Sequence, residues 1–277
     1  MADRMTTKKS RSDRSAAVPA ADVEASRPGG AGTMPARRPA RCRRYILIAS
    51  LLLTTIAMAT KKPAPPPTEV EITAEPHHQL IFHNEYVRVY DVVVTPKDAT
   101  LLHNHRHDYL YVLLGAAEIS NEVEGKAAVK ATVTDGEVKF VEGGFAHVVR
   151  NVGETPFHNI TVELLQDEKT RNVPASKWNA ENAIRVQGGV EDVLFVKDGV
   201  RVARVQLETA GFEHRHHHAG PHLVIALTDM TLRSEAPDKS AANIELKAGQ
   251  VRWIEGNITH SVTNVGSQPV KLVSLEF

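Results

Sequence analysis

Short runs of β-branched and aliphatic residues recur along the chain from about residue 87 onward, and turn signals such as Thr134-Asp135-Gly136 and Lys247-Ala248-Gly249 separate them. The runs of strand length include 87–95, 110–114, 160–165, 200–207 and 272–277. Only residues 175–184 have a pattern that suits a helix. Short, evenly spaced strands without long helical crossovers predict an all-β sandwich or closed barrel.

The apolar runs belong to an internal repeat with an offset of 113 residues (200 minus 87), since Val87-Arg88-Val89 recurs as Val200-Arg201-Val202. The same offset relates His103 to His216, His105 to His218, Gly136 to Gly249, His147 to His260, Asn151 to Asn264 and Glu163 to Glu276. One register held over so many positions indicates a duplication. We therefore predict two similar β domains in one chain.

A different pattern precedes the repeat. Residues 45–59 form an unbroken apolar run that follows a cluster of five arginines and ends at Ala57-Met58-Ala59. This is the pattern of a secretory signal peptide, and the run is shorter than the roughly 20 residues that a membrane-spanning helix needs. We expect cleavage after Ala59 and export to the periplasm or the cell exterior, with no membrane contact afterwards; the alternative is an uncleaved N-terminal membrane anchor.

These patterns divide the chain into six segments. We expect a disordered basic leader at 1–44, in which translation starting at Met34 is an alternative, then the signal segment at 45–59 and a Pro-rich spacer at 60–76. The first barrel is expected at 77–170, a linker at 171–189 and the second barrel at 190–277.

Charge and cysteine content narrow the chemistry. Residues 1–59 hold 11 Lys and Arg against 4 Asp and Glu, so the rest of the chain holds 22 against 29, a net charge of −7. An acidic body without a basic stripe excludes nucleic acid as a partner. The only cysteine, Cys42, lies in the leader, whereas all 14 histidines follow residue 76. A thiol nucleophile, a disulfide and a zinc–thiolate site are therefore excluded from the body, and any metal must bind to nitrogen and oxygen.

Candidate metal ligands occur in the first copy as His103-x-His105, followed by Asp108 and, 42 residues after His105, by His147. On a strand, His103 and His105 point to the same side about 6–7 Å apart, within reach of one ion. The turn at 142–144 lets a later strand bring His147 beside them. Imidazole and carboxylate donors suit a divalent transition metal: Fe, Mn, Ni, Co or Zn.

The second copy is richer in histidine, and the repeat register selects His216, His218 and His260 as the equivalent ligands. We place His222 in the position of Asp108, with a loop one residue longer, as a fourth ligand. His214 then remains as a partner of these ligands or an alternative ligand. The remaining histidines are interpreted as surface or core residues: His77, His78, His83, His107, His158 and His217.

These spacings resemble the two motifs of the cupin superfamily. The second motif, a glycine followed by a turn, a histidine and an asparagine, matches Gly136, 142–144, His147 and Asn151, and again Gly249, 255–257, His260 and Asn264. The chain departs from it where the family has proline, since both copies have glutamate (Glu142 and Glu255), and at Asn257, which replaces glycine. The resemblance implies a bicupin, two tandem double-stranded β-helix (jelly-roll) barrels with the metal inside. It also implies a glutamate ligand, where this chain offers Asp108 and His222.

The ligand sets and the resemblance together favour a metal-dependent enzyme, dioxygenase-like, acting on a small organic molecule outside the cytoplasm. We expect apolar side chains to form the barrel wall: Leu101, Leu110, Val112, Val149, Val224, Ala226 and Val262. Two alternatives stay open, because cupins include many activities on one scaffold. One is a non-catalytic protein that binds or senses a small molecule, and the other is a metal buffer. A homo-oligomer is compatible with either.

Overall fold

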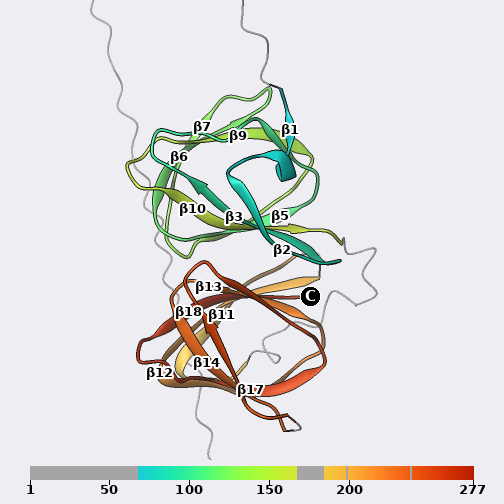
Figure 1. The fold of residues 1–277 in the computed structure, drawn as a ribbon, viewed down its shortest axis with the longest axis vertical. Coiled ribbons are helices and arrows are strands. Elements are labelled where there is room, and N and C mark those ends of the chain that lie inside the picture. Colours follow the sequence, from blue (N-terminus) through green and yellow to red (C-terminus); the bar gives the residue numbers. More distant parts are fainter. Residues whose placement is uncertain (1–67, 167–183, 198, 238) are drawn as a thin grey trace, which may run out of the picture. The chain divides into compact units, whose positions relative to one another are not determined.

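The computed structural model describes residues 68–166, 184–197, 199–237 and 239–277. The leader, the signal segment and residues 175–183 of the expected helix lie outside these ranges. The described residues form strands and one short 3-10 helix, and they build two cupin-like barrels (Figure 1), which confirms the all-β, two-domain prediction. No helix among them is long and apolar enough to cross a membrane.

The N-terminal barrel consists of two five-stranded sheets with the orders β1-β4-β9-β6-β7 and β2-β3-β10-β5-β8. Its elements are β1 (Val70–Glu71), η1 (Ile72–Ala74), β2 (His78–His83), β3 (Val87–Val94), β4 (His103–His105), β5 (Tyr109–Leu113), β6 (Ala117–Val123), β7 (Val129–Val133), β8 (Val138–Val141), β9 (Phe145–Asn151) and β10 (Phe157–Leu164). A cavity of about 110 Å³ is lined by residues of both sheets, so the sheets enclose it.

The C-terminal barrel is one eight-stranded sheet. Its strands are β11 (Val186–Lys197), β12 (Val200–His218), β13 (His222–Ala226), β14 (Met230–Glu235), β15 (Ala242–Leu246), β16 (Val251–Ile254), β17 (Ile258–Asn264) and β18 (Val270–Glu276). The long strand β12 pairs with β18 over 201–207 and with β17 over 212–218. In the N-terminal barrel two strands make the equivalent pairings, because β3 pairs with β10 and β4 pairs with β9.

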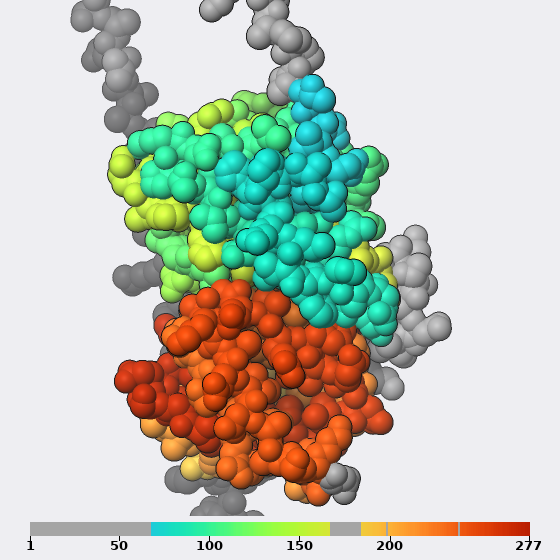
Figure 2. All heavy atoms as spheres, viewed as in Figure 1, coloured from blue at the N-terminus to red at the C-terminus, as the bar shows by residue number. Residues whose placement is uncertain are grey.

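Each repeat forms its own barrel. No described strand of β1–β10 pairs with a strand of β11–β18. In Figure 2 the atoms of each repeat form one body, coloured blue-green to yellow for the first repeat and orange to red for the second. Residues 70–74, which the sequence placed in the Pro-rich spacer, form β1 and η1, and β1 pairs in parallel with β4. The N-terminal barrel therefore begins before residue 77.

The central strands of both barrels, such as β5, β10 and β13, are buried on both faces. One buried cluster contains residues of both repeats, including Val89 and Leu110 from the first and Leu223 and Leu275 from the second. Trp253 packs against this cluster and stacks on Phe82 with ring centroids 5.8 Å apart. Burial on both faces makes these strands nearly continuous apolar runs.

A buried asparagine at the end of β9 and another at the end of β17 stabilise the turns that follow these strands. Asn151 donates from Nδ2 to the carbonyls of Val94 and Thr155, and its Oδ1 accepts from the amide of Gly153. Asn264 makes the equivalent bonds in the C-terminal barrel, including one from the amide of Gly266. Both motif asparagines are thus structural.

We expect Asn151→Ala to lower the free energy of unfolding by about 2–3 kcal/mol, because it removes three hydrogen bonds of a buried side chain and leaves the Val94 carbonyl without that donor. Denaturant unfolding of Asn151→Ala would measure this, with Asn243→Ala at an exposed position as the control. Equal stability of the two variants would contradict the prediction.

Candidate metal centres

The N-terminal histidine centre consists of His103, His105 and His147. Strand β4 pairs antiparallel with β9 so that His103 lies directly opposite His147. Strand alternation puts His105 on the same side as His103. The Nε2 atoms of His103 and His105 lie 3.2 Å apart, and the ring centroid of His147 lies 4.5 Å from that of His103 and 5.1 Å from that of His105. The structure thus brings the rings of these three predicted ligands together, and the nitrogens that lie within 4.8 Å of one another in this barrel are those of His103, His105 and His78.

The C-terminal histidine centre repeats this arrangement with His216, His218 and His260. His216 lies opposite His260 in the β12–β17 ladder. The Nε2 atoms of His216 and His218 are 2.9 Å apart, and the centroid of His260 is 4.7 Å and 5.3 Å from those of His216 and His218. One nitrogen from each ring lies within 4.8 Å of the others, a spacing that one metal ion can bridge.

Hydrogen bonds at Nδ1 orient the rings. His103 donates to the Leu101 carbonyl at 2.9 Å, and His216 donates to the His214 carbonyl at 2.7 Å. The Nδ1 atom of His147 bonds with Asn121 Oδ1, and that of His260 bonds with Ser234 Oγ, both at 2.8 Å. Fixing Nδ1 leaves Nε2 as the ligand atom, as in known metal sites. His214 acts here through its backbone carbonyl.

A buried glutamate lies behind the middle histidine of each centre. Glu163 Oε1 lies 3.9 Å from His105 Nδ1, and Glu276 Oε2 lies 3.1 Å from His218 Nδ1. Burial raises the pKa of Glu163. No role beside the histidines was predicted for either glutamate from the sequence. The repeat offset that relates Glu163 to Glu276 was a signal that both have the same role.

The donor atoms fit a divalent metal. His147 Nε2 and His260 Nε2 are buried and have no hydrogen-bond partner among the described residues. Burial, followed by the neighbouring imidazoles, lowers the pKa of His147 and His260 to about 3. Burial also lowers the pKa of His103 to about 4. At neutral pH these rings are uncharged, with lone pairs free for a metal, and an unpartnered buried nitrogen is costly without one.

Asp108 and His222 have other contacts. Asp108 Oδ1 accepts a hydrogen bond from the Gly143 amide at 2.8 Å, so Asp108 stabilises the turn before His147. His222 stacks on His218 with ring centroids 4.2 Å apart and an interplanar angle of 27°. Neither residue belongs to a group of converging ligand atoms among the described residues.

The strand register corrects the equivalence of Asp108 and His222. Tyr109 lies opposite Glu163 on β10, and His222 lies opposite Glu276 on β18. Tyr109 also stacks on His105, 4.0 Å between centroids, as His222 stacks on His218. His222 therefore occupies the place of Tyr109, and the offset of 113 (222 minus 109) continues without the extra loop residue.

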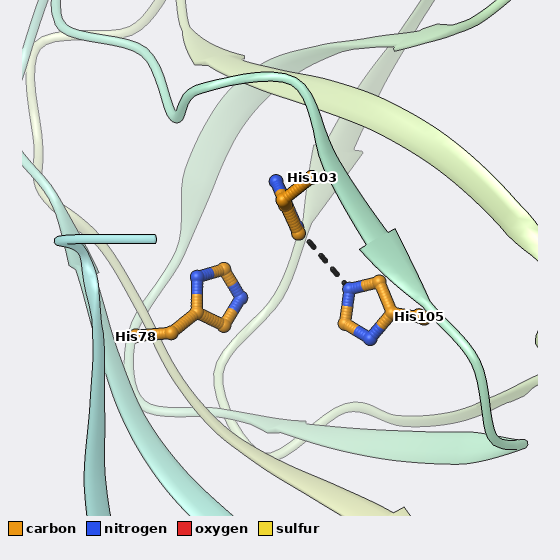
Figure 3. Close-up of side chains that lie close together, drawn as sticks. All are labelled: His78, His103 and His105. Carbon is orange, nitrogen blue, oxygen red and sulfur yellow. Dashed lines mark hydrogen bonds between the residues drawn. The ribbon is translucent and has the colours of Figure 1, made fainter. Parts of the chain in front are cut away.

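His78 also lies at the N-terminal histidine centre, although the sequence predicted an ordinary core or surface residue at this position. It comes from β2 and lies beside His103 and His105, with ring centroids 4.6 Å and 5.9 Å away (Figure 3). One nitrogen from each of these three rings lies within 4.8 Å of the others. The repeat gave no signal for it, because the equivalent residue is Glu191 (78 plus 113).

The cavity that the histidines line in the C-terminal barrel, about 40 Å³, contains further groups for which the sequence predicted no role. Arg201 Nη2 donates to Glu191 Oε1 at 2.6 Å, and both side chains are almost fully buried. Glu213 lines the same cavity as His218 and His260. Burial, and then the charge of Glu191, raises the pKa of Glu213 to about 8, against the opposing effect of Arg201.

Two histidine-bearing barrels in one chain define a bicupin fold, as the motifs predicted. No family model matches the sequence, and no curated protein matches it. Among solved structures, a variant of oxalate decarboxylase from Bacillus subtilis is similar, with a TM-score of 0.51, 13% identity and coverage of 70% of this chain and 69% of that one. Oxalate decarboxylase from Lactobacillus farciminis in a formate complex is similar too, at a TM-score of 0.51 and 13% identity, covering 70% and 77%. A further Bacillus subtilis structure concerns the Mn(II) centres of that enzyme, at a TM-score of 0.50 and 15% identity, covering 70% and 69%. At such identity the likeness concerns the fold.

Proposed function

We propose that this chain is an exported metal-dependent enzyme that acts on a small organic molecule by oxygenase-type chemistry. The observation that carries the proposal is the convergence of ring nitrogens inside each barrel, with His147 Nε2 and His260 Nε2 buried and unpartnered among the described residues. A divalent metal of the Fe, Mn, Ni, Co or Zn type, bound there, supplies Lewis-acid polarisation of a chelating substrate or, for a redox-active ion, activation of dioxygen.

The C-terminal barrel is the better candidate for turnover. Its three imidazoles, from His216, His218 and His260, leave coordination positions for substrate. Glu213 lines the same cavity and, with a pKa of about 8, carries a proton at neutral pH that it can give to a bound substrate. Arg201 lines the same cavity, and its guanidinium, which Glu191 holds in place, is positioned to orient a substrate carboxylate.

The two cavities, about 110 Å³ and about 40 Å³, limit the substrate to a few non-hydrogen atoms unless the barrels open. Small size and the fold likeness to oxalate decarboxylases favour a small dicarboxylate such as oxalate as a second candidate, consumed by decarboxylation. Dioxygen uptake distinguishes oxidation from a redox-neutral decarboxylation, which releases carbon dioxide without net oxygen consumption.

The test is to load the full chain with Fe, Mn or Ni and to follow dioxygen uptake and carbon dioxide release with phenols, flavonoids, diketones and oxalate. We expect turnover of at least one compound, and we expect Glu213→Gln to lower kcat by roughly 100-fold, the usual contribution of a positioned proton donor. Gln has the shape of Glu without its proton. Saturable binding of a compound with neither gas exchanged would favour a non-catalytic binding protein instead.

A further inference from the structure

The N-terminal histidine centre differs from its repeat by one buried imidazole. His78 is 9% exposed, lies on β2 opposite Val92 and presents a ring nitrogen within 4.8 Å of ligand nitrogens of His103 and His105. Figure 3 shows its ring beside that pair, approaching from a different strand. We infer that His78 is a fourth imidazole ligand of the N-terminal metal centre and that buried Glu75 positions it. This inference rests on the proposed metal-dependent function.

Glu75 holds His78 in the orientation that a ligand needs. Its carboxylate is 2% exposed, and Oε2 accepts a hydrogen bond from His78 Nδ1 at 2.7 Å. The amide of Leu101 and the ring of His77 bond to Oε1 at 3.1 Å and 2.9 Å. A carboxylate only accepts, so Nδ1 of His78 carries the proton and Nε2 keeps its lone pair. Carboxylate–histidine pairs of this kind fix the ring and raise its basicity toward a metal.

The second repeat supplies an internal comparison. Glu191 lies opposite Val205 on β12, as His78 lies opposite Val92 on β3, and the offset of 113 relates both pairs (191 minus 78; 205 minus 92). Glu191 bonds to Arg201, so this place holds an ion pair where the N-terminal barrel has an imidazole. The two repeats therefore differ at this place, because the N-terminal barrel has an imidazole beside its pair of strand histidines and the C-terminal barrel has the Glu191–Arg201 ion pair.

The difference in ligand number separates two roles. A metal with four protein ligands is characteristic of a closed, structural site, whereas three ligands leave a position for water or substrate. With His78 bound, the N-terminal metal is the more closed of the two. The C-terminal metal keeps the open positions that the proposed reaction needs.

The experiment uses full-length chain carrying His260→Ala, which confines tight metal binding to the N-terminal centre, titrated with Co²⁺ as a spectroscopic probe. We expect His78→Ala in this background to weaken Co²⁺ binding by roughly 100-fold. This is the upper end of the loss of metal affinity that changes around a metal site usually cause. The d–d absorption of Co²⁺ bound to the His78→Ala variant should also shift with added azide, because the coordination position that His78 occupied is then open. His83→Ala changes an exposed histidine of the same strand and should behave like the background.

Glu75→Gln is the second variant. It keeps an acceptor for His78 Nδ1 and changes no ligand, so we expect roughly 10-fold weaker Co²⁺ binding and an absorption spectrum of unchanged shape. Binding in His78→Ala equal to that in His83→Ala, with both insensitive to azide, would overturn the role of His78 while leaving the metal-dependent function intact. A wild-type chain that binds no metal at all would overturn both.

Discussion

Replacement of His260 by alanine is expected to remove one of about two bound metal ions and to abolish turnover, because the C-terminal centre then keeps only two imidazoles on one strand. His260 is the only described ligand of that centre that comes from β17, and the pairing of His216 with His260 is what closes the site across two strands. Elemental analysis of protein dialysed against metal-free buffer would measure the stoichiometry.

His217→Ala is the matched control for this prediction. His217 neighbours two candidate ligands on the same strand, but it is exposed and its ring bonds to Thr259 Oγ1 at 3.0 Å, away from the centre. We expect His217→Ala to keep its full metal content and turnover. Loss of metal in both variants would point to damage of β12, and full metal in His260→Ala would refute the C-terminal centre.

Metal binding should also appear as stability. Each ion that binds only the folded chain adds about 2.7 kcal/mol when its free concentration is 100 times its dissociation constant. The loss on chelation should therefore be roughly halved in His260→Ala, because one site no longer contributes. This separates loss of a metal from a simple loss of packing, which would lower the stability of the chelated chain as well.

The sequence was sufficient for the ligands that lie on paired strands and recur in the repeat. His103 and His105 follow from strand alternation, and His147 follows from the offset that carries it to His260. Strand alternation needs no tertiary information, since its period is set by the backbone. The duplication supplies the third ligand, because a histidine that both copies keep in the same register is expected to lie at the same position in both barrels.

The sequence was not sufficient where one strand is apolar on both faces. Leu110 and Val112 were expected to line the cavity, but they lie in the cluster shared with the other repeat, while Tyr109 and Tyr111 line the cavity. With both faces buried, hydrophobicity cannot tell which face points inward. Leu101, another expected wall residue, is 47% exposed.

His78 could not have been found from spacing. Its position beside His103 depends on β2 pairing with β3, in the sheet that faces the one containing β4. Such a contact between sheets has no period along the chain. The repeat hides it further, since the second copy places Glu191 there to pair with Arg201. Such a contact becomes visible only in the folded barrel, where the two sheets lie against each other.

Acidification of the metal-free chain from pH 7.5 to 5.5 is expected to lower its free energy of unfolding by about 5–6 kcal/mol, because buried neutral histidines oppose protonation. The pKa is lowered by burial to about 4 in His103 and His216 and to about 3 in His147, His222 and His260, and burial lowers that of His105 further. Between these values and the unfolded pKa of about 6.5, the unfolded chain binds more protons, so stability falls as the pH falls.

Two buried carboxyls, Glu163 and Glu213, act in the opposite direction, and Glu213 is included in that figure because its shift is large. The pKa of Glu213 is raised to about 8 by burial and by Glu191, so its contribution to stability grows as the pH falls toward the unfolded value. Each histidine contributes about 1.4 kcal/mol over this interval and Glu213 offsets about two of them, which leaves a net loss. Denaturant unfolding in chelator at both pH values would measure it. His147→Gln should remove about one histidine's share of the loss, and a chain equally stable at both pH values would show that these imidazoles are not held neutral in the barrels.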